Sequence, residues 1–326
     1  MLYPRTIPRQ GNHQAICWLQ NARVLDANCQ LPEQLFLPDI LRSTLSGGSA
    51  VASDSVGTSF AAPKVSHIAA YLAAEFPNES CLLYRALIVQ SARWLEWAMA
   101  DNVDKLQVIR QIGYGLPNFD RALNNSQNRI TLITRGEKHI KARQAHVYQV
   151  KLPDNLRSQG EELDILLEVT LSYKAQPRRT RRNRRRYLST WVDWECSKRG
   201  EDPDSFLARV LKEYDAPDDA DKGDKIFSWT LGKQKNHGRT QGISRSAGTL
   251  QKDWAMVKSY NLRDAFCIAV VGHEGWNNDP DANAPYSLVV SFEAVESNIP
   301  IYAALVEAQV EPEIELQTEI QVTSNQ

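Results

Sequence analysis

The sequence predicts an α/β segment over residues 1–125, an all-β sandwich over residues 126–306 and a flexible acidic tail over residues 307–326. Before residue 125, apolar residues recur at helical spacing. Beyond it, runs rich in β-branched and aromatic residues are separated by long polar insertions. The tail is acidic and poor in aromatic residues, so we expect it to fray.

The first segment should contain two main helices. One is expected from Ser59 to just before Pro77, because the apolar residues there repeat at helical spacing. Pro63 would lie in its first turn, where a missing N–H costs little. A second helix is expected over residues 79–98, and one more helical turn over residues 118–124.

The second segment should be built from strands, with one helix over residues 203–214. Several runs alternate between apolar and polar residues, as half-buried strands do. Such a pattern is typical of a β-sandwich with elaborated loops. The expected strands are Ile130–Thr134, His146–Leu152, Leu163–Tyr173, Tyr187–Glu195, Phe266–Val271 and Tyr286–Glu293, with Pro300–Leu305 also extended.

Composition excludes several classes of function. The net charge is -1, so the chain as a whole has no pull toward nucleic acid or an anionic membrane. No apolar run approaches the ~20 residues that span a bilayer, and no signal peptide is visible. The odd cysteine count without a CxxC pair argues against a disulfide framework or a zinc site. We therefore expect a cytoplasmic protein with reduced thiols, no metal and no cofactor. The five cysteines are Cys17, Cys29, Cys81, Cys196 and Cys267.

One motif carries catalytic chemistry. Residues 57–65 read GTSFAAPKV. Gly57 would allow a sharp turn and a close approach of substrate backbone, and Thr58 leads into the helix. Ser59 would lie at the helix start, where free N–H groups and the helix dipole favour developing negative charge. The Ser59 N–H would be one donor of an oxyanion hole.

This motif resembles the signature around the nucleophilic serine of subtilases, a family of serine endopeptidases. Residues 85–92 and 113–123 are similar to the helix and the G-x-G segment that follow in that family. The β-rich remainder resembles the C-terminal sandwich of large bacterial subtilases encoded beside an AAA-type ATPase. The resemblance implies peptide-bond hydrolysis with Ser59 as nucleophile, a peptide or protein substrate, and an AAA-type ATPase as a partner.

The sequence departs from the family pattern where the other triad members belong. Subtilases order their triad Asp, His, Ser, and only 58 residues precede Ser59. His13 is not followed by the Gly-Thr pair that follows the catalytic histidine of subtilases. Asp26 lies in a segment similar to the strand and turn that come after that histidine in the family, so it does not match the triad aspartate. His67 would lie about 12 Å from Ser59 along the same helix, which is too far for it to act as the base for Ser59. We therefore expect a truncated peptidase that is inactive as an isolated chain.

The arginine-rich run from Arg178 to Arg186 has the charge of a phosphate-binding patch. No nucleic-acid-binding motif accompanies it, so we favour a solvated loop and do not expect nucleic acid as a partner. Binding of an acidic protein partner by this run is a third alternative. The stretch His273–Trp276 is expected to be a loop, and the tryptophans of the second segment are expected in or beside the core.

Two functions remain open from sequence alone. The first is a subtilisin-like serine endopeptidase. The second is a non-catalytic interaction module, in which the β-sandwich and the arginine-rich loop bind an ATPase or another protein and Ser59 is inherited scaffold.

Overall fold

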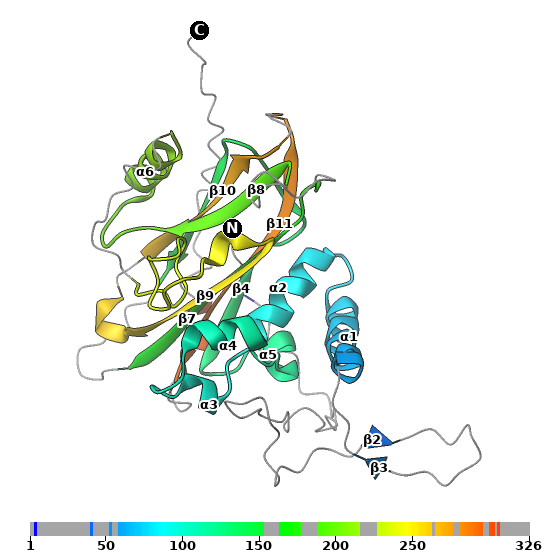
Figure 1. Cartoon of the computed structure of the whole chain (residues 1–326). Helices are drawn as coiled ribbons and strands as arrows, with labels where there is room; N and C mark the ends of the chain where they lie inside the picture. Colours follow the sequence, from blue (N-terminus) through cyan, green and yellow to red (C-terminus); the bar gives the residue numbers. More distant parts are fainter. Residues whose placement is uncertain are drawn as a thin grey trace.

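The computed structural model describes residues 58–152, 163–177, 188–215, 227–262, 265–276, 279, 281–295, 300–303 and 305–306, together with the short stretches 3–4, 40–41 and 52–53. Helices and antiparallel sheets form a mixed α/β structure (Figure 1). The change from helices to strands falls just after residue 123. The expected domain boundary at residue 125 lies there and stays a prediction.

The helical part contains the helix expected at Ser59. The helices are α1 (Thr58–Glu75), α2 (Cys81–Ser91), α3 (Glu96–Met99), α4 (Lys105–Ile112), α5 (Phe119–Leu123) and, in the strand-rich part, α6 (Pro203–Asp215). The positions expected for α1, α5 and α6 are confirmed.

The single helix expected over residues 79–98 is wrong, because α2 ends at Ser91. Ala92 is extended, and Arg93 forms an antiparallel bridge with Leu116. The Arg93 N–H donates to the Leu116 carbonyl at 3.1 Å, and the Leu116 N–H donates back at 2.9 Å. Because these two hydrogen bonds hold Arg93 in an extended conformation, the helix does not continue past Ser91.

Every described pairing between strands is antiparallel. One sheet has the order β1-β4-β11-β7-β9, with β5 also paired to β11, and a second has the order β6-β10-β8. The strands are β1 (Tyr3–Pro4), β2 (Ile40–Leu41), β3 (Ala52–Ser53), β4 (Arg129–Ile133), β5 (Lys138–Lys141), β6 (Ala145–Lys151), β7 (Asp164–Tyr173), β8 (Thr190–Cys196), β9 (Leu250–Lys258), β10 (Ala265–Glu274) and β11 (Asn283–Ala294).

The strands expected between Ile130 and Glu293 are confirmed, except that β8 begins at Thr190 and Tyr187 lies outside the described residues. Two further strands, β5 and β9, were missed. The extended run expected over Pro300–Leu305 is wrong. Tyr302 and Ala303 are helical, and the Leu305 N–H donates to the Ile301 carbonyl at 3.1 Å. A helical turn puts Ile301 and Leu305 on one face, and both are buried.

The larger sheet has a buried face on each side. Leu288, Val290 and Phe292 of β11 join a core cluster that also contains Val192 and Trp194 of β8. Val289, between them in sequence, joins a different cluster formed with α1, α2 and α5. The larger sheet therefore lies between the smaller sheet and the helical layer (Figure 1).

Gly115 is required where the chain returns from α4 toward the end of α2. Its φ of +94° is unfavourable for other residues, and a Cβ atom there would lie 2.1 Å from the Arg93 carbonyl oxygen. The glycine of the predicted G-x-G segment thus lets the backbone approach Arg93 closely.

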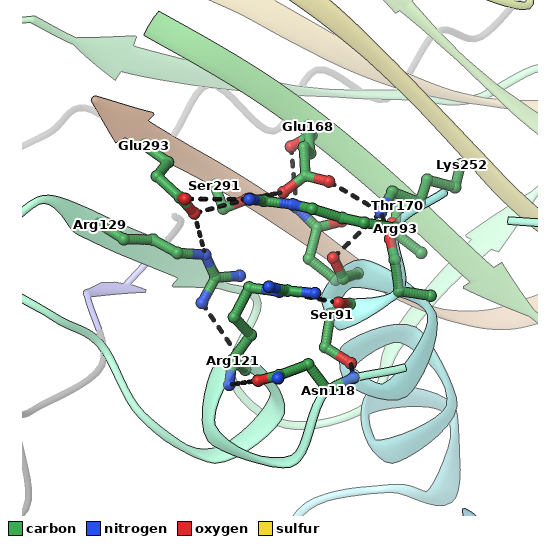
Figure 2. A network of polar contacts seen from close by, with 12 residues as sticks. Ser91, Arg93, Asn118, Arg121, Arg129, Glu168, Thr170, Lys252, Ser291 and Glu293 are labelled. Carbon is green, nitrogen blue, oxygen red and sulfur yellow. Dashed lines mark hydrogen bonds and ion pairs between the residues drawn. The ribbon is translucent and has the colours of Figure 1, made fainter. Parts of the chain in front are cut away.

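A buried charged network joins the helical layer to the larger sheet (Figure 2). Glu168 of β7 lies at its centre, 2.8 Å from Lys252 Nζ and 3.1 Å from Arg93 Nη2. Glu168 and Lys252 are each 2% exposed. Arg93 also binds both carboxylate oxygens of Glu293 on β11, at 2.9 and 2.6 Å. Such two-point pairing fixes the direction of the arginine side chain.

Lys252 connects the network to the C-terminus of α2. Its Nζ donates to the carbonyl oxygens of Ala92 at 2.6 Å and Gln90 at 3.1 Å. A cation there meets the negative end of the helix dipole and satisfies carbonyls that have no helical partner. Gln90 in turn donates to Ser291 on β11 at 2.7 Å.

The pKa values reflect this arrangement. Burial by itself raises the pKa of Glu168, but Lys252, Arg93 and Arg129 outweigh it and hold that pKa at about 2. Burial lowers the pKa of Lys252 to about 8, against the opposing effect of Glu168. Both groups are charged at pH 7, so they form a buried ion pair.

The Glu168 carboxylate should make stability depend on pH. Its folded pKa of about 2 lies below an unfolded value of about 4.3, so its contribution is complete above that value and decreases as pH falls. We expect the Glu168→Gln variant to unfold with about 3 kcal/mol less free energy than the natural chain at pH 7. By pH 3 the difference should shrink to roughly half or less. Urea unfolding at both pH values measures it, and an unchanged difference would contradict this assignment.

Candidate active site

Ser59 lies in the first turn of α1 with its side chain exposed, and Thr58 beside it is also exposed. The helix start predicted from the motif is therefore confirmed. The N–H groups of the first helical turn have no partner within the helix, and the dipole is positive there. Gly57, expected to shape the loop before the serine, lies outside the described residues.

The C-terminal half of α1 anchors the helix. Ile68 and Leu72 of α1 are buried, and they pack in one cluster with Leu87 of α2, Ile133 of β4 and Val289 of β11. They stand four residues apart, on one face of the helix. The helix is thus fixed to α2 and to the larger sheet beneath it.

The N-terminal half of α1 is uncovered. Every residue from Ala61 to His67 is exposed, and Val65 is 38% exposed. In the part of the chain that the structure describes, this half of the helix therefore has no buried side chain from Ala61 to His67.

The histidine nearest to Ser59 in sequence contacts aromatic residues. The His67 ring lies 4.8 Å from the Tyr71 ring and 5.6 Å from the Phe119 ring, measured between centroids. Within the described residues, no side chain forms a hydrogen bond with the Ser59 hydroxyl. His67 therefore packs on α5 and does not pair with the serine.

Three further histidines, His139, His146 and His273, lie in the strands. His139 is 3.2 Å from Glu137, and His146 Nδ1 is 2.7 Å from the Tyr286 hydroxyl. His273 Nε2 is 2.8 Å from Asp193 Oδ1. None of these contacts involves Ser59.

Buried Asp193 and partly buried His273 form an aspartate–histidine pair that was not predicted from the sequence. His273 was expected in a loop, but it belongs to β10, paired across from Trp191 of β8. Its ring stacks on Trp191 with centroids 3.7 Å apart. Burial raises the pKa of Asp193, but Lys233 and His273 outweigh it and hold that pKa well below its usual range. The alternation of Trp191, Asp193 and Glu195 with core residues in β8 was the available signal.

This pair cannot serve Ser59, because the two sheets lie between them. On β10, Ile268 and Val270 face the shared core, whereas Ala269 and Val271 pack with α6. His273 follows the second set in the alternation, so it lies on the α6 side of the smaller sheet. Ser59 belongs to the helical layer on the other side of the larger sheet (Figure 1).

The remaining predicted features have these outcomes. His13, Asp26, the run from Arg178 to Arg186 and the tail lie outside the described residues. Trp194 and Trp229 are buried in the core, as expected. Among the residues that the structure covers, no cluster of three His, Cys, Asp or Glu side chains could hold a metal ion. Within the same ranges, no helix has the length and apolar composition needed to cross a membrane.

The comparison with known protein families points to the same segment. Residues 43–115, which include Ser59, α1 and α2, match the model of the subtilase family. This match supports a subtilisin-like family for that part of the chain. An uncharacterized protein of Sinorhizobium fredii, y4bN, is 25% identical over 240 residues, which cover 72% of this chain. The matched region is 52% of that relative, so this chain spans about half of its length.

Replacing Ser59 should leave stability unchanged, because its side chain is exposed and makes no described hydrogen bond. We expect Ser59→Ala to change the free energy of unfolding by less than about 0.5 kcal/mol. Leu72→Ala, in the buried anchor of the same helix, should cost about 2–5 kcal/mol. Urea unfolding of both variants measures this difference. A large loss for Ser59→Ala would show that the serine has a structural role.

Proposed function

We propose that this chain is the nucleophile-bearing part of a subtilisin-like serine endopeptidase, with Ser59 as the nucleophile. The observation that carries the proposal is the position of Ser59 in the first turn of a firmly anchored helix, within the segment that matches the subtilase family. The G-T-S-F-A-A-P-K-V motif supports the same role.

The reaction would be acyl transfer. The Ser59 Oγ attacks the carbonyl carbon of a peptide bond, its proton passes to a general base, and the amine leaves with a proton from that group. The Ser59 N–H at the helix start would donate to the developing oxyanion. Water then hydrolyses the acyl-enzyme. This sequence needs a histidine within hydrogen-bond reach of Ser59.

We propose that the histidine and aspartate come from another chain and not from residues 1–326. His67 packs against Tyr71 and Phe119, and the Asp193–His273 pair lies beyond the two sheets. The exposed face of α1 from Ala61 to His67 would then be covered by the part of the peptidase that carries these groups. Without the base, the loss in turnover is about 10⁶-fold.

Several finer assignments belong to the same proposal. The two sheets that share one core would be the β-sandwich of large bacterial subtilases, in a cytoplasmic protein that works beside an AAA-type ATPase. A second candidate function is a non-catalytic interaction module that binds a protein through this β-sandwich and the arginine-rich loop. The observation that favours it is the absence, within the described residues, of a histidine that contacts Ser59.

Labelling with a fluorophosphonate probe tests the nucleophile. We expect residues 1–326 alone to label no more than the Ser59→Ala variant, because Ser59 lacks a base. Adding the part of the Sinorhizobium fredii relative outside the matched region should restore labelling that depends on Ser59, if that part supplies the base.

Labelling of the chain alone and labelling with the added part of the relative together distinguish the peptidase from the interaction module. Labelling of the isolated chain that Ser59→Ala abolishes would contradict the claim that its base lies elsewhere. Mass spectrometry of the labelled peptide identifies the modified residue. No labelling in either arm would contradict the peptidase proposal and favour the interaction module.

A further inference from the structure

Three arginines gather next to Glu293, where α5 meets the larger sheet (Figure 2). Arg93 follows α2, Arg121 lies on α5 and Arg129 begins β4. Arg129 is 3% exposed, and its Nε lies 3.4 Å from Glu293. Yet Arg129 Nη2 is buried without a hydrogen-bond partner, and so is Arg93 Nε. Buried donors of charged groups rarely stay unpaired, because each unpaired group costs its full desolvation free energy.

The arginines are held in place by other contacts. Arg121 Nε donates to the Ser91 carbonyl at 3.0 Å, and Arg129 Nη1 donates to the Arg121 carbonyl at 2.9 Å. Arg93 is fixed by Glu168 and Glu293. The unpaired N–H groups therefore belong to side chains whose positions are set by the fold.

The charges in this cluster do not balance. The positive groups Arg93, Arg121, Arg129 and Lys252 face the carboxylates of Glu168 and Glu293, and Lys252 is paired with Glu168. Exposed Asp120 is a further carboxylate that acts on Arg121. Burial lowers the pKa of Arg129 to about 10 and that of Arg121 below its usual range, and repulsion among the arginines adds to both. A water molecule would satisfy an N–H but leave this positive charge uncompensated.

We propose that the arginine cluster of Arg93, Arg121 and Arg129 binds a small oxyanion, a carboxylate or phosphate group. Guanidinium N–H groups match the oxygens of such anions in spacing and charge. Arg129 Nη2 supplies the buried donor, and Arg121, which is partly exposed, supplies the second cation. The site lies at the junction of α5 and the larger sheet, so its occupancy would stabilise the helical layer on the sheet.

Thermal unfolding of the full chain tests the site. Inorganic phosphate and acetate are titrated separately, with sodium chloride at equal ionic strength as reference. We expect one of the two anions to raise the unfolding temperature with a saturable dependence, because it binds the folded state alone. The anion that does so identifies the ligand as phosphate-like or carboxylate-like.

The matched variants are Arg121→Gln in the cluster and Arg110→Gln, an exposed arginine of α4. Arg121→Gln should weaken binding about tenfold or more, and Arg110→Gln should leave it unchanged. Arg129→Lys, which keeps the charge and lacks Nη2, should also weaken binding.

Two results would overturn the proposal. One is that neither anion stabilises the natural chain beyond chloride. The other is that binding to Arg121→Gln is as tight as binding to the natural chain. If Arg121→Gln or Arg129→Lys fails to fold, isothermal titration of the natural chain with each anion still decides, because no saturable heat means no site.

Discussion

The buried contact of Glu168 with Lys252 and Arg93 is the interaction on which the described structure depends. Lys252 lies on β9, Glu168 on β7 and Arg93 after α2, so one carboxylate links two strands to the helical layer. Each of the charges is costly to bury alone, and together they satisfy one another and the carbonyls at the end of α2. The network therefore fixes where α2 ends and how it lies on the sheet.

The candidate nucleophile depends on this arrangement indirectly. Ser59 is held by α1, and α1 is held by the apolar contacts of Ile68 and Leu72 with α2 and the larger sheet. A shift of α2 on the sheet would move the serine helix with it. The same junction also brings the three arginines together, so the anchoring of the helix and the proposed anion site share one set of contacts. The chemistry of Ser59, by contrast, needs groups that lie outside the described residues.

The sequence predicted the helix at Ser59 and most strands because their apolar residues follow clear periods. It missed β9 because Lys252 and Asp253 interrupt the apolar pattern, and both are buried through ion pairs that only the folded chain brings together. It extended α2 too far, since the bridge between Arg93 and Leu116 joins residues that are distant in sequence. The Asp193–His273 pair was missed for the same reason. The apolar periodicity of the sequence thus predicted the helix that carries Ser59. It did not predict the charged contacts, because these join residues that are distant in sequence.

A double-mutant cycle on Glu168 and Lys252 tests most directly whether the buried ion pair at the centre of the network stabilises the fold. The free energy of unfolding is measured at pH 7 for Glu168→Gln, Lys252→Met and the double variant. Each single change removes one partner of a buried charge, so each should cost about 3 kcal/mol, and the double variant should cost at least about 1 kcal/mol less than their sum. Costs that simply add would show that the two residues act independently and would contradict the account.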